Sequence, residues 1–171
     1  MEVFDLYDNN FNKLDRKMVR GGTNNEGEYH LVVHIWFRNS KGEYLIQQRN
    51  KKEDSVPYQW AATGGAAISG DNSIQTAIKE TYEEIGLKLE PNQLQLVKRY
   101  FIENHISNYI TDLYIVKEDI LIEDLTIDTL EVRDVAYKTM NQIKEMIRNN
   151  EFWNYARLME RSDYFELLEK S

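Results

Sequence analysis

Three glutamates in the middle of the sequence have the residue type and the spacing of a metal-binding group. Glu80, Glu83 and Glu84 stand at i, i+3 and i+4, so on a helix their carboxylates fall within one arc of about 100°. Like charges at this spacing destabilise an isolated helix by about 0.2–0.5 kcal/mol per pair. A hard divalent cation such as Mg²⁺ or Mn²⁺ prefers oxygen ligands and would reverse that repulsion. A solvated acidic face is the ordinary alternative, and the glycine loop just before the glutamates favours the metal site.

The stretch that carries these glutamates opens with two glycines and closes near a third. It runs from residue 64 to residue 87 and reads GGAAISGDNSIQTAIKETYEEIGL. Gly86 is placed to end a helix, because glycine readily adopts the left-handed conformation found just after a helix. Apolar side chains at helical spacing predict one buried stripe on this helix. The stripe comprises Ile74, Ala77, Ile78, Thr81 and Ile85.

The spacing of these glycines and glutamates resembles the Nudix box of the Nudix hydrolase superfamily, which would cover residues 65–87 here. The family pattern is Gly, five residues, Glu, seven residues, then Arg-Glu-apolar-any-Glu-Glu-any-Gly-apolar. The last three glutamates of the pattern, at residues 80, 83 and 84, and both of its glycines match. The chain departs from it at three positions, with Asp71 in place of Glu, Lys79 in place of Arg and Thr81 in place of an aliphatic residue.

The resemblance implies an enzyme that hydrolyses a diphosphate joined to another group, often a nucleoside, with Mg²⁺ or Mn²⁺ as cofactor. It implies that Glu80, Glu83 and Glu84 are metal ligands, and that Glu83 or Glu80 is the catalytic base. The backbone of Gly64 and Gly65 would lie close to the phosphates, where a side chain would interfere. It further implies that substrate specificity resides mostly outside the box, in loops such as 104–108 and 118–129.

Four residues outside this core set are further candidates. Arg49 ends a strand that runs beside the active site in the resembling family; it either binds a substrate phosphate or is a surface arginine. Glu103 and Glu131 are alternative bases or ligands, and each may equally be a solvated carboxylate. Lys79 would orient the ligand Glu83 by its charge, but it lacks the planar fork of arginine. We therefore expect Glu83 to be oriented less precisely and the activity to be retained.

The elements that must position these residues follow from hydrophobic periodicity. A very apolar run at 29–37 predicts a central strand buried on both faces, and 43–49 should pair back against it. His30 and His34 in this region are expected to be hydrogen-bonded core histidines. The segment from about 140 to 171 predicts helices, and its aromatic residues either cap the core or form a homodimer contact. Other strands are predicted at 2–7 and 11–19, as an N-terminal hairpin, and at 61–64, 94–103, 109–117 and 130–138.

Composition is that of one soluble globular domain. The chain has 171 residues, 42% of them hydrophobic, which predicts a single domain over residues 1–171. Together with the resemblance, this predicts an α/β fold, an α/β/α sandwich with a mixed sheet. With 21 basic and 29 acidic residues the net charge is −8, which disfavours a nucleic-acid polymer as partner. A small anionic substrate is compatible with this charge if a cation binds it to the protein. No apolar run is long enough to cross a membrane and no signal peptide is evident, so we expect a cytoplasmic protein.

Two other functions are weighed against the hydrolase. The stretch HLVVHIWFRNSKGEYLIQQR resembles isopentenyl diphosphate isomerases of the same fold, and His30 falls where they carry a metal-binding histidine. Those enzymes need a catalytic cysteine, and this sequence contains none, so isomerase activity is rejected. A non-catalytic sensor of a nucleotide or diphosphate ligand is the second alternative. Because the three glutamates are intact, the hydrolase is favoured, and the substrate is left unnamed.

Overall fold

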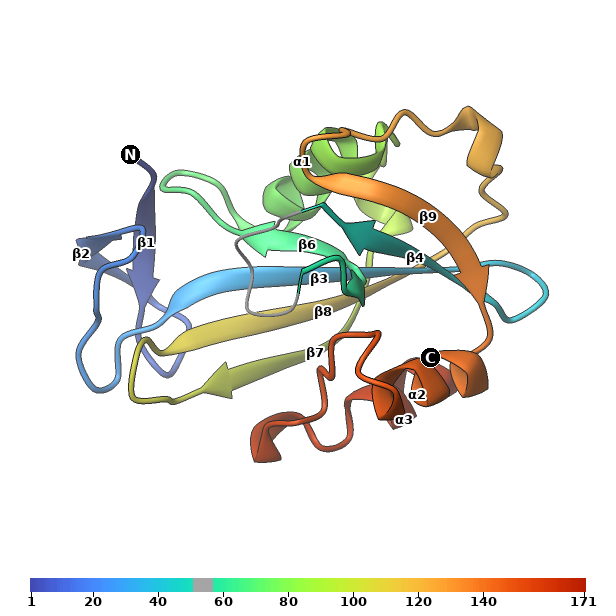
Figure 1. Ribbon diagram of the computed structural model, residues 1–171. Helices are drawn as coiled ribbons and strands as arrows, with labels where there is room; N and C mark the ends of the chain where they lie inside the picture. Colours follow the sequence, from blue (N-terminus) through green and yellow to red (C-terminus); the bar gives the residue numbers. More distant parts are fainter. Residues whose placement is uncertain (51–56) are drawn as a thin grey trace.

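The computed structural model describes residues 1–50 and 57–171. Its centre is a mixed sheet with the strand order β5-β4-β3-β8-β7, in which β6 also pairs with β3 and β9 with β4. A separate two-stranded sheet, β1-β2, lies at one end (Figure 1). The strands are β1 Val3–Tyr7, β2 Lys13–Val19, β3 His30–Arg38, β4 Tyr44–Arg49, β5 Trp60–Ala61, β6 Thr63–Ala66, β7 Gln95–Ile102, β8 Tyr109–Lys117 and β9 Val132–Lys138. The α-helices are α1 Ser73–Ile85, α2 Met140–Arg148 and α3 Tyr164–Lys170, and the short 3-10 helices are η1 Pro91–Gln93, η2 Ile122–Asp124 and η3 Met159–Arg161.

Strand β3 is the central strand of the sheet, as its sequence predicts. It pairs in parallel with β8 along its whole length and antiparallel with β4 and β6. Its apolar side chains point to both faces, so Val33 and Ile35 are buried on one side and Trp36 on the other. This arrangement buries the strand on both faces, as a continuous apolar run requires.

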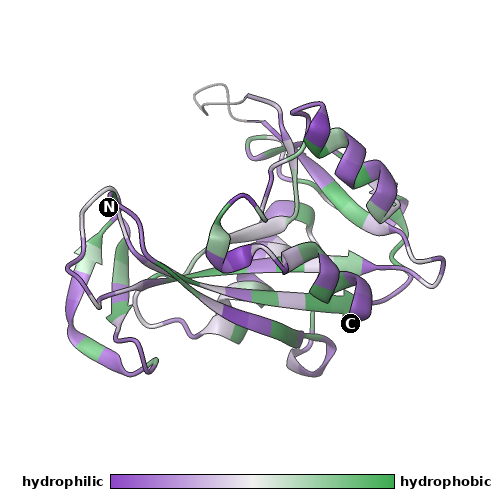
Figure 2. Cartoon of the chain, turned by 90° about the horizontal axis from the view of Figure 1, so that it is seen from below, coloured by the Kyte–Doolittle hydropathy of each residue, from purple (hydrophilic) through white to green (hydrophobic). Residues whose placement is uncertain are grey.

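Helices cover both faces of the sheet, which makes the α/β/α sandwich (Figure 1). Helix α1 packs on one face through Ala77 and Ile85, which join the cluster around Val33 and Ile35. The C-terminal segment with α2 and α3 covers the other face, where its aromatic side chains surround Trp36. The segment therefore caps the core, the first of the two roles that its sequence leaves open. In Figure 2 the hydrophobic residues run along the strands in the middle of the molecule, and the helices carry both hydrophilic and hydrophobic residues.

Both ends of helix α1 are fixed by specific residues. The side chain of Asn72 accepts a hydrogen bond from the backbone N–H of Gln75, and the side chain of Gln75 accepts one from the backbone N–H of Asn72. Gly86 follows the helix with φ of 71°, and its N–H donates to the carbonyl of Tyr82. The predicted left-handed end at Gly86 is therefore confirmed.

The buried face of α1 differs from the predicted stripe. Ala77, Thr81 and Ile85 are buried as predicted, but Ile74 is 39% exposed and Glu84 is only 9% exposed. The face that meets the sheet is thus rotated around the helix toward Glu84. An amphipathic pattern locates a helix face only within a wide arc, and packing against the sheet decides which part of that arc is buried.

The N-terminal hairpin packs against the turn that leads into α1. Strands β1 and β2 pair antiparallel, as predicted, and the backbone N–H of Ser69 donates to the carbonyl of Val3 at 2.7 Å. The carboxylate of Asp5 accepts hydrogen bonds from the Ser69 hydroxyl at 2.8 Å and from the Gly70 N–H at 2.9 Å. The hairpin therefore holds the loop between β6 and α1 in place.

A membrane span would need about 20 consecutive apolar residues in helical form. The longest helix in the described part of the chain, α1, has 13 residues. None of the described helices combines the length and the apolar character of a span.

Candidate active site

An acidic cavity of about 410 Å³ lies where α1, β6 and the N-terminal hairpin meet. The three box glutamates all line it, beside the two glycines that open the box. Two further acids, Asp128 and Glu131, reach it from the segment before β9. The remaining lining residues are Glu2, Arg20, Arg49 and Ala66. We refer to this space as the acidic cavity.

The two glycines allow β6 to pass very close to its neighbours. A Cβ atom at residue 65 would overlap the carboxyl group of Glu80, and one at residue 64 would overlap the carbonyl oxygen of Val33. Neither glycine is among the described glycines with positive φ, so close approach accounts for both. The resemblance implies that these glycines lie near the phosphates; in the structure the group closest to the missing side chain of Gly65 is the carboxyl of Glu80.

Glu84 is held by hydrogen bonds from β4 and β6. Its Oε2 atom accepts from the Gln47 side-chain amide at 3.0 Å and from the Gly64 N–H at 3.3 Å. Thr63 in turn donates from its hydroxyl to the Gln47 carbonyl oxygen at 3.1 Å. These contacts fix the carboxyl group of Glu84 at the point where α1 meets β6.

Burial raises the pKa of two of the box glutamates. The pKa of Glu84 rises to about 8, because burial outweighs the hydrogen bond from Gln47. The pKa of Glu80 rises to about 7, chiefly through burial and next through the charge of Glu83. Both carboxyl groups therefore hold their protons more tightly than an exposed glutamate does, and the positive charge of a bound cation would favour their ionised forms.

The chemistry of this donor set suits a hard divalent cation. Carboxylate oxygens are the ligands that Mg²⁺ and Mn²⁺ prefer, and the acidic cavity offers five carboxyl groups besides Glu2. Within the described residues no three acidic or histidine side chains already converge on one point as metal ligands. Glu80, Glu83 and Glu84 line the same cavity from α1, so these are the residues that could hold such a cation.

The structure separates the candidates outside the box. Arg49, at the end of β4, and Glu131 both line the acidic cavity. Glu103 follows β7, is exposed, and accepts a hydrogen bond from the Tyr29 hydroxyl at 2.5 Å; among the described residues it lines neither this cavity nor the larger one below.

Lys79 and Asp71, the two charged residues that differ from the box pattern, form an ion pair with each other. Lys79 lies 3.7 Å from Asp71, and both side chains are partly exposed. Lys79 thus forms an ion pair with Asp71, and in the described part of the chain it forms none with Glu83. Asp71 does not cap α1, because Asn72 does. The charge of Lys79 also lowers the pKa of Glu80, against the larger raising effects of burial and Glu83.

Several residues of the acidic cavity carry no local signal in the sequence. Glu2 and Arg20 come from the hairpin, where they form an ion pair with each other. Asp128 is positioned by its backbone N–H, which donates to the carbonyl of Glu84 at 2.9 Å. Only the fold brings these residues to the box, although the acidic loop 118–129 is a predicted specificity segment.

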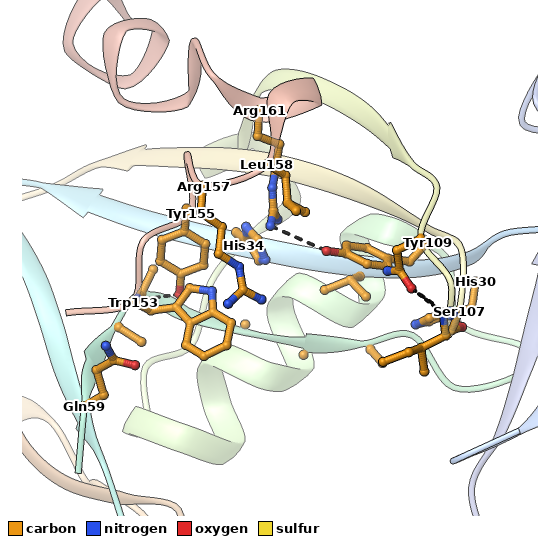
Figure 3. A pocket seen from close by; sticks show the side chains of 18 of the residues that line it. His30, His34, Gln59, Ser107, Tyr109, Trp153, Tyr155, Arg157, Leu158 and Arg161 are labelled. Atoms are coloured by element: carbon orange, nitrogen blue, oxygen red, sulfur yellow. Dashed lines mark hydrogen bonds between the residues drawn. The ribbon is translucent and has the colours of Figure 1, made fainter. Parts of the chain in front are cut away.

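A larger cavity of about 810 Å³ adjoins the acidic one (Figure 3). The two share Arg49 and the β6 residues Gly64, Gly65 and Ala66. The larger cavity lies against the sheet face that the C-terminal segment covers, and residues 104–107 of the predicted specificity loop form part of its wall. Its remaining lining residues are His30, Val32, His34, Gln59, Ala61, Ala62, Tyr109, Trp153, Tyr155, Arg157, Leu158 and Arg161.

The two histidines of β3 are hydrogen-bonded to the protein, as predicted. His34 is 9% exposed, and its Nδ1 atom lies 2.9 Å from the hydroxyl of Tyr164. Burial, with a smaller effect from Arg161, lowers the pKa of His34 to about 3. The Nδ1 atom of His30 lies 3.1 Å from the carbonyl of Asn108. Both imidazoles therefore support the wall of the larger cavity.

Comparisons with known proteins agree with this geometry. The family model described as NUDIX domain matches residues 28–159. An uncharacterized Nudix hydrolase of Listeria innocua is 32% identical over 156 residues, covering 91% of this chain and 90% of that protein.

Two solved structures share the fold. A protein from Deinococcus radiodurans superposes with a TM-score of 0.68 at 18% identity, over 99% of this chain and 98% of that one. The NUDIX domain of Shewanella oneidensis NrtR, complexed with ADP ribose, gives 0.61 at 15% identity over 82% and 88%. The family match, the Listeria relative and the sandwich around the box helix together show that this chain belongs to the Nudix hydrolase family.

Proposed function

We propose that this protein hydrolyses the diphosphate linkage of a nucleoside diphosphate joined to another group, or of a related small diphosphate, with Mg²⁺ or Mn²⁺ in the acidic cavity. The observation that carries this proposal is the pair of adjoining cavities, one acidic and one lined by aromatic and arginine side chains, which share β6. A molecule with a diphosphate at β6 could extend into both. The ADP ribose bound by the NrtR domain is a nucleoside diphosphate joined to a second group, which supports this substrate class.

The three box glutamates of α1 and the two glycines of β6 each have a role in this proposal. Glu80, Glu83 and Glu84 would hold the cation, which when bound neutralises phosphate charge and lowers the pKa of a water molecule. The backbone of Gly64 and Gly65, in the wall that the two cavities share, would lie close to the diphosphate. Most of the rate acceleration would come from such positioning and charge stabilisation.

Two further roles concern the phosphates and the proton. Arg49 lines both cavities and would contact the phosphates from the end of β4. Glu83 or Glu80 would accept the proton of the attacking water, and Glu131 is the candidate outside the box that lines the same cavity. Glu103 lies elsewhere and is not assigned a role.

The test is a hydrolysis screen over nucleoside diphosphate sugars, dinucleoside polyphosphates and simple nucleoside diphosphates with Mg²⁺, followed by product analysis. We expect turnover that a chelator abolishes. Glu83→Gln and Glu84→Gln should each lower kcat at least 100-fold, whereas Glu145→Gln, on the exposed side of α2, should leave it unchanged. Tight binding of a nucleotide without turnover would support the sensor instead, and turnover unaffected by both box variants would refute the assignment.

Three further points are proposals as well. We place the protein in the cytoplasm, with a small-molecule substrate as its partner and no nucleic-acid polymer. The net charge of −8 supports the last point, because polyanions are repelled. A homodimer is a further proposal, which size-exclusion chromatography with light scattering tests directly.

A further inference from the structure

Arg161 is a buried cation with weak partners. It ends η3, is 2% exposed, and lines the larger cavity. Its guanidinium donates to the hydroxyls of Thr111 and Tyr109 at 3.5 Å each, the long limit of a hydrogen bond, as Figure 3 shows for Tyr109. Its Nε atom is buried with no hydrogen-bond partner in the described part of the chain. Burying a charge without such compensation is costly, so the arrangement calls for a ligand.

The acids nearest to Arg161 in sequence do not compensate it. Asp163 pairs with Lys98 at 2.7 Å and accepts a hydrogen bond from Tyr100 at 2.9 Å. Glu160 is exposed. Among the described residues no carboxylate forms an ion pair with the Arg161 guanidinium. The interior end of the larger cavity is therefore electropositive in a chain whose net charge is −8.

The opposite side of the cavity offers a second unpaired group. The Oε1 atom of Gln59 is buried and has no hydrogen-bond partner in the described residues. Between Gln59 and Arg161 lie the rings of Trp153 and Tyr155, and the guanidinium of Arg157 stacks over Trp153 at 4.5 Å (Figure 3). The cavity thus presents a cation, an aromatic wall and a hydrogen-bond acceptor to one ligand.

We propose that Arg161 binds a second anionic group, a phosphate monoester or a carboxylate, on the part of the substrate beyond the diphosphate. This rests on the proposed function, because it places the diphosphate at β6. The two cavities share Gly64, Gly65 and Arg49, so a molecule bound at β6 could extend from the acidic cavity into the cavity that Arg161 lines. A group with two or more anionic oxygens matches the fork of donors that Arg161 presents. Arg161 would therefore determine specificity and take no part in the chemical step.

Binding measured in EDTA, where no turnover occurs, tests this site apart from catalysis. Orthophosphate is the first probe, and it should raise the Tm of the wild type. Two matched pairs follow in calorimetry: NAD and NADP differ by one phosphate, and UDP-glucose and UDP-glucuronate differ by one carboxylate. We expect the wild type to prefer the more anionic member of at least one pair by tenfold or more, and the preferred pair identifies the anion.

Arg161→Gln should abolish that preference and the orthophosphate shift while changing the affinity of the less anionic member by less than threefold. Arg161→Lys should retain part of the preference, because it keeps the charge. Arg148→Gln, at an exposed arginine of α2, is the matched control and should behave as the wild type does. Equal binding of both members of both pairs, or an equal loss for both members in Arg161→Gln, would overturn the proposal.

The stability of the ligand-free protein distinguishes a ligand-binding role of Arg161 from a purely structural one. Arg161→Met removes a buried charge that has no acidic partner, so its Tm without ligand should equal or exceed that of the wild type. A clear fall in Tm would show that the guanidinium stabilises the fold, against the proposal. If the anion preference depends on Arg161 but no diphosphate is hydrolysed, only the hydrolase proposal fails. If hydrolysis is found and Arg161→Gln leaves selectivity intact, only the anion site fails.

Discussion

The carboxyl group of Glu80 occupies the space in which a side chain on Gly65 would lie. Helix α1 and strand β6 therefore approach each other closely at this point, although Glu80 lies 15 positions after Gly65 in the sequence. Its carboxyl end is flexible, so a methyl group at residue 65 would displace it and leave the backbone in place.

Gly65→Ala should consequently impair activity more than stability. We expect kcat/KM to fall about tenfold or more, since a small misplacement of a catalytic group has an effect of this size, with Tm changed by only a few degrees. Combining it with Glu80→Asp, whose shorter side chain gives the methyl group room, should cost less than the two single variants together. Strict additivity in this double-mutant cycle would contradict the contact.

Mg²⁺ should stabilise the folded protein by binding to the acidic cavity. At a concentration 100 times Kd, a ligand specific to the folded state adds about 2.7 kcal/mol of stability. We expect Mg²⁺ or Mn²⁺ to raise the Tm of the wild type, a chelator to reverse this, and Glu84→Gln to weaken it strongly. Glu145→Gln, at an exposed glutamate of α2, serves as control. A Tm increase that survives Glu84→Gln would place the cation elsewhere.

Asp5 should make folding stability depend on pH in the acidic range. Burial alone would raise its pKa, but hydrogen bonds from Lys13, Gly70 and Ser69 lower the pKa to about 2. Its contribution is thus fully present above pH 4 and is lost as the pH falls toward 2. The shift corresponds to about 2 kcal/mol, so Asp5→Asn should lower the free energy of unfolding by about that amount at pH 7.

Urea unfolding at a series of pH values measures this contribution. The difference between wild type and Asp5→Asn should narrow as the pH drops below about 4. Asp15→Asn, at an exposed position of β2, should show little difference at any pH. A constant gap for Asp5→Asn between pH 7 and pH 3 would mean that its charge does not matter.

His34 should destabilise the fold under mildly acidic conditions. Its pKa is lowered to about 3, chiefly by burial, whereas an unfolded histidine has a pKa of about 6.5. Below pH 6.5 the unfolded state therefore binds a proton that the folded state excludes, and stability falls by up to about 1.4 kcal/mol per pH unit. His34→Gln should flatten this slope between pH 6.5 and pH 5, and His105→Gln, at an exposed loop residue, should preserve it.

How much the sequence predicts depends on whether a residue's role is set locally. Glu80, Glu83 and Glu84 can be predicted as metal ligands because they lie within about one helical turn of each other. The end of the helix at Gly86 can be predicted because it follows from the conformational preference of glycine. The burial of Glu84 could not be foreseen, because it depends on Gln47 of β4, which approaches from another part of the chain. A helical pattern fixes neighbours on one element but not the surface that the element meets.

The residues of the larger cavity are even harder to predict from the sequence than the burial of Glu84. Arg161 lies 127 positions after His34, and no motif or spacing links them in the sequence. Its significance depends on burial and on missing partners, which are properties of the folded structure. Trp153 and Tyr155 were expected only as part of an aromatic C-terminal segment, and their place in a cavity wall follows from how that segment crosses the sheet.

The two cavities share β6 but take other parts of their walls from different elements, which has a consequence for how this enzyme can diversify. The box glutamates come from α1 on one face of the sheet, whereas Trp153, Tyr155 and Arg161 of the larger cavity come from the C-terminal segment on the other (Figure 1). We therefore expect changes in that terminal segment to alter ligand preference and to leave the box residues unchanged. A library randomised at Gln59, Trp153 and Arg161 would sample new preferences without touching the box.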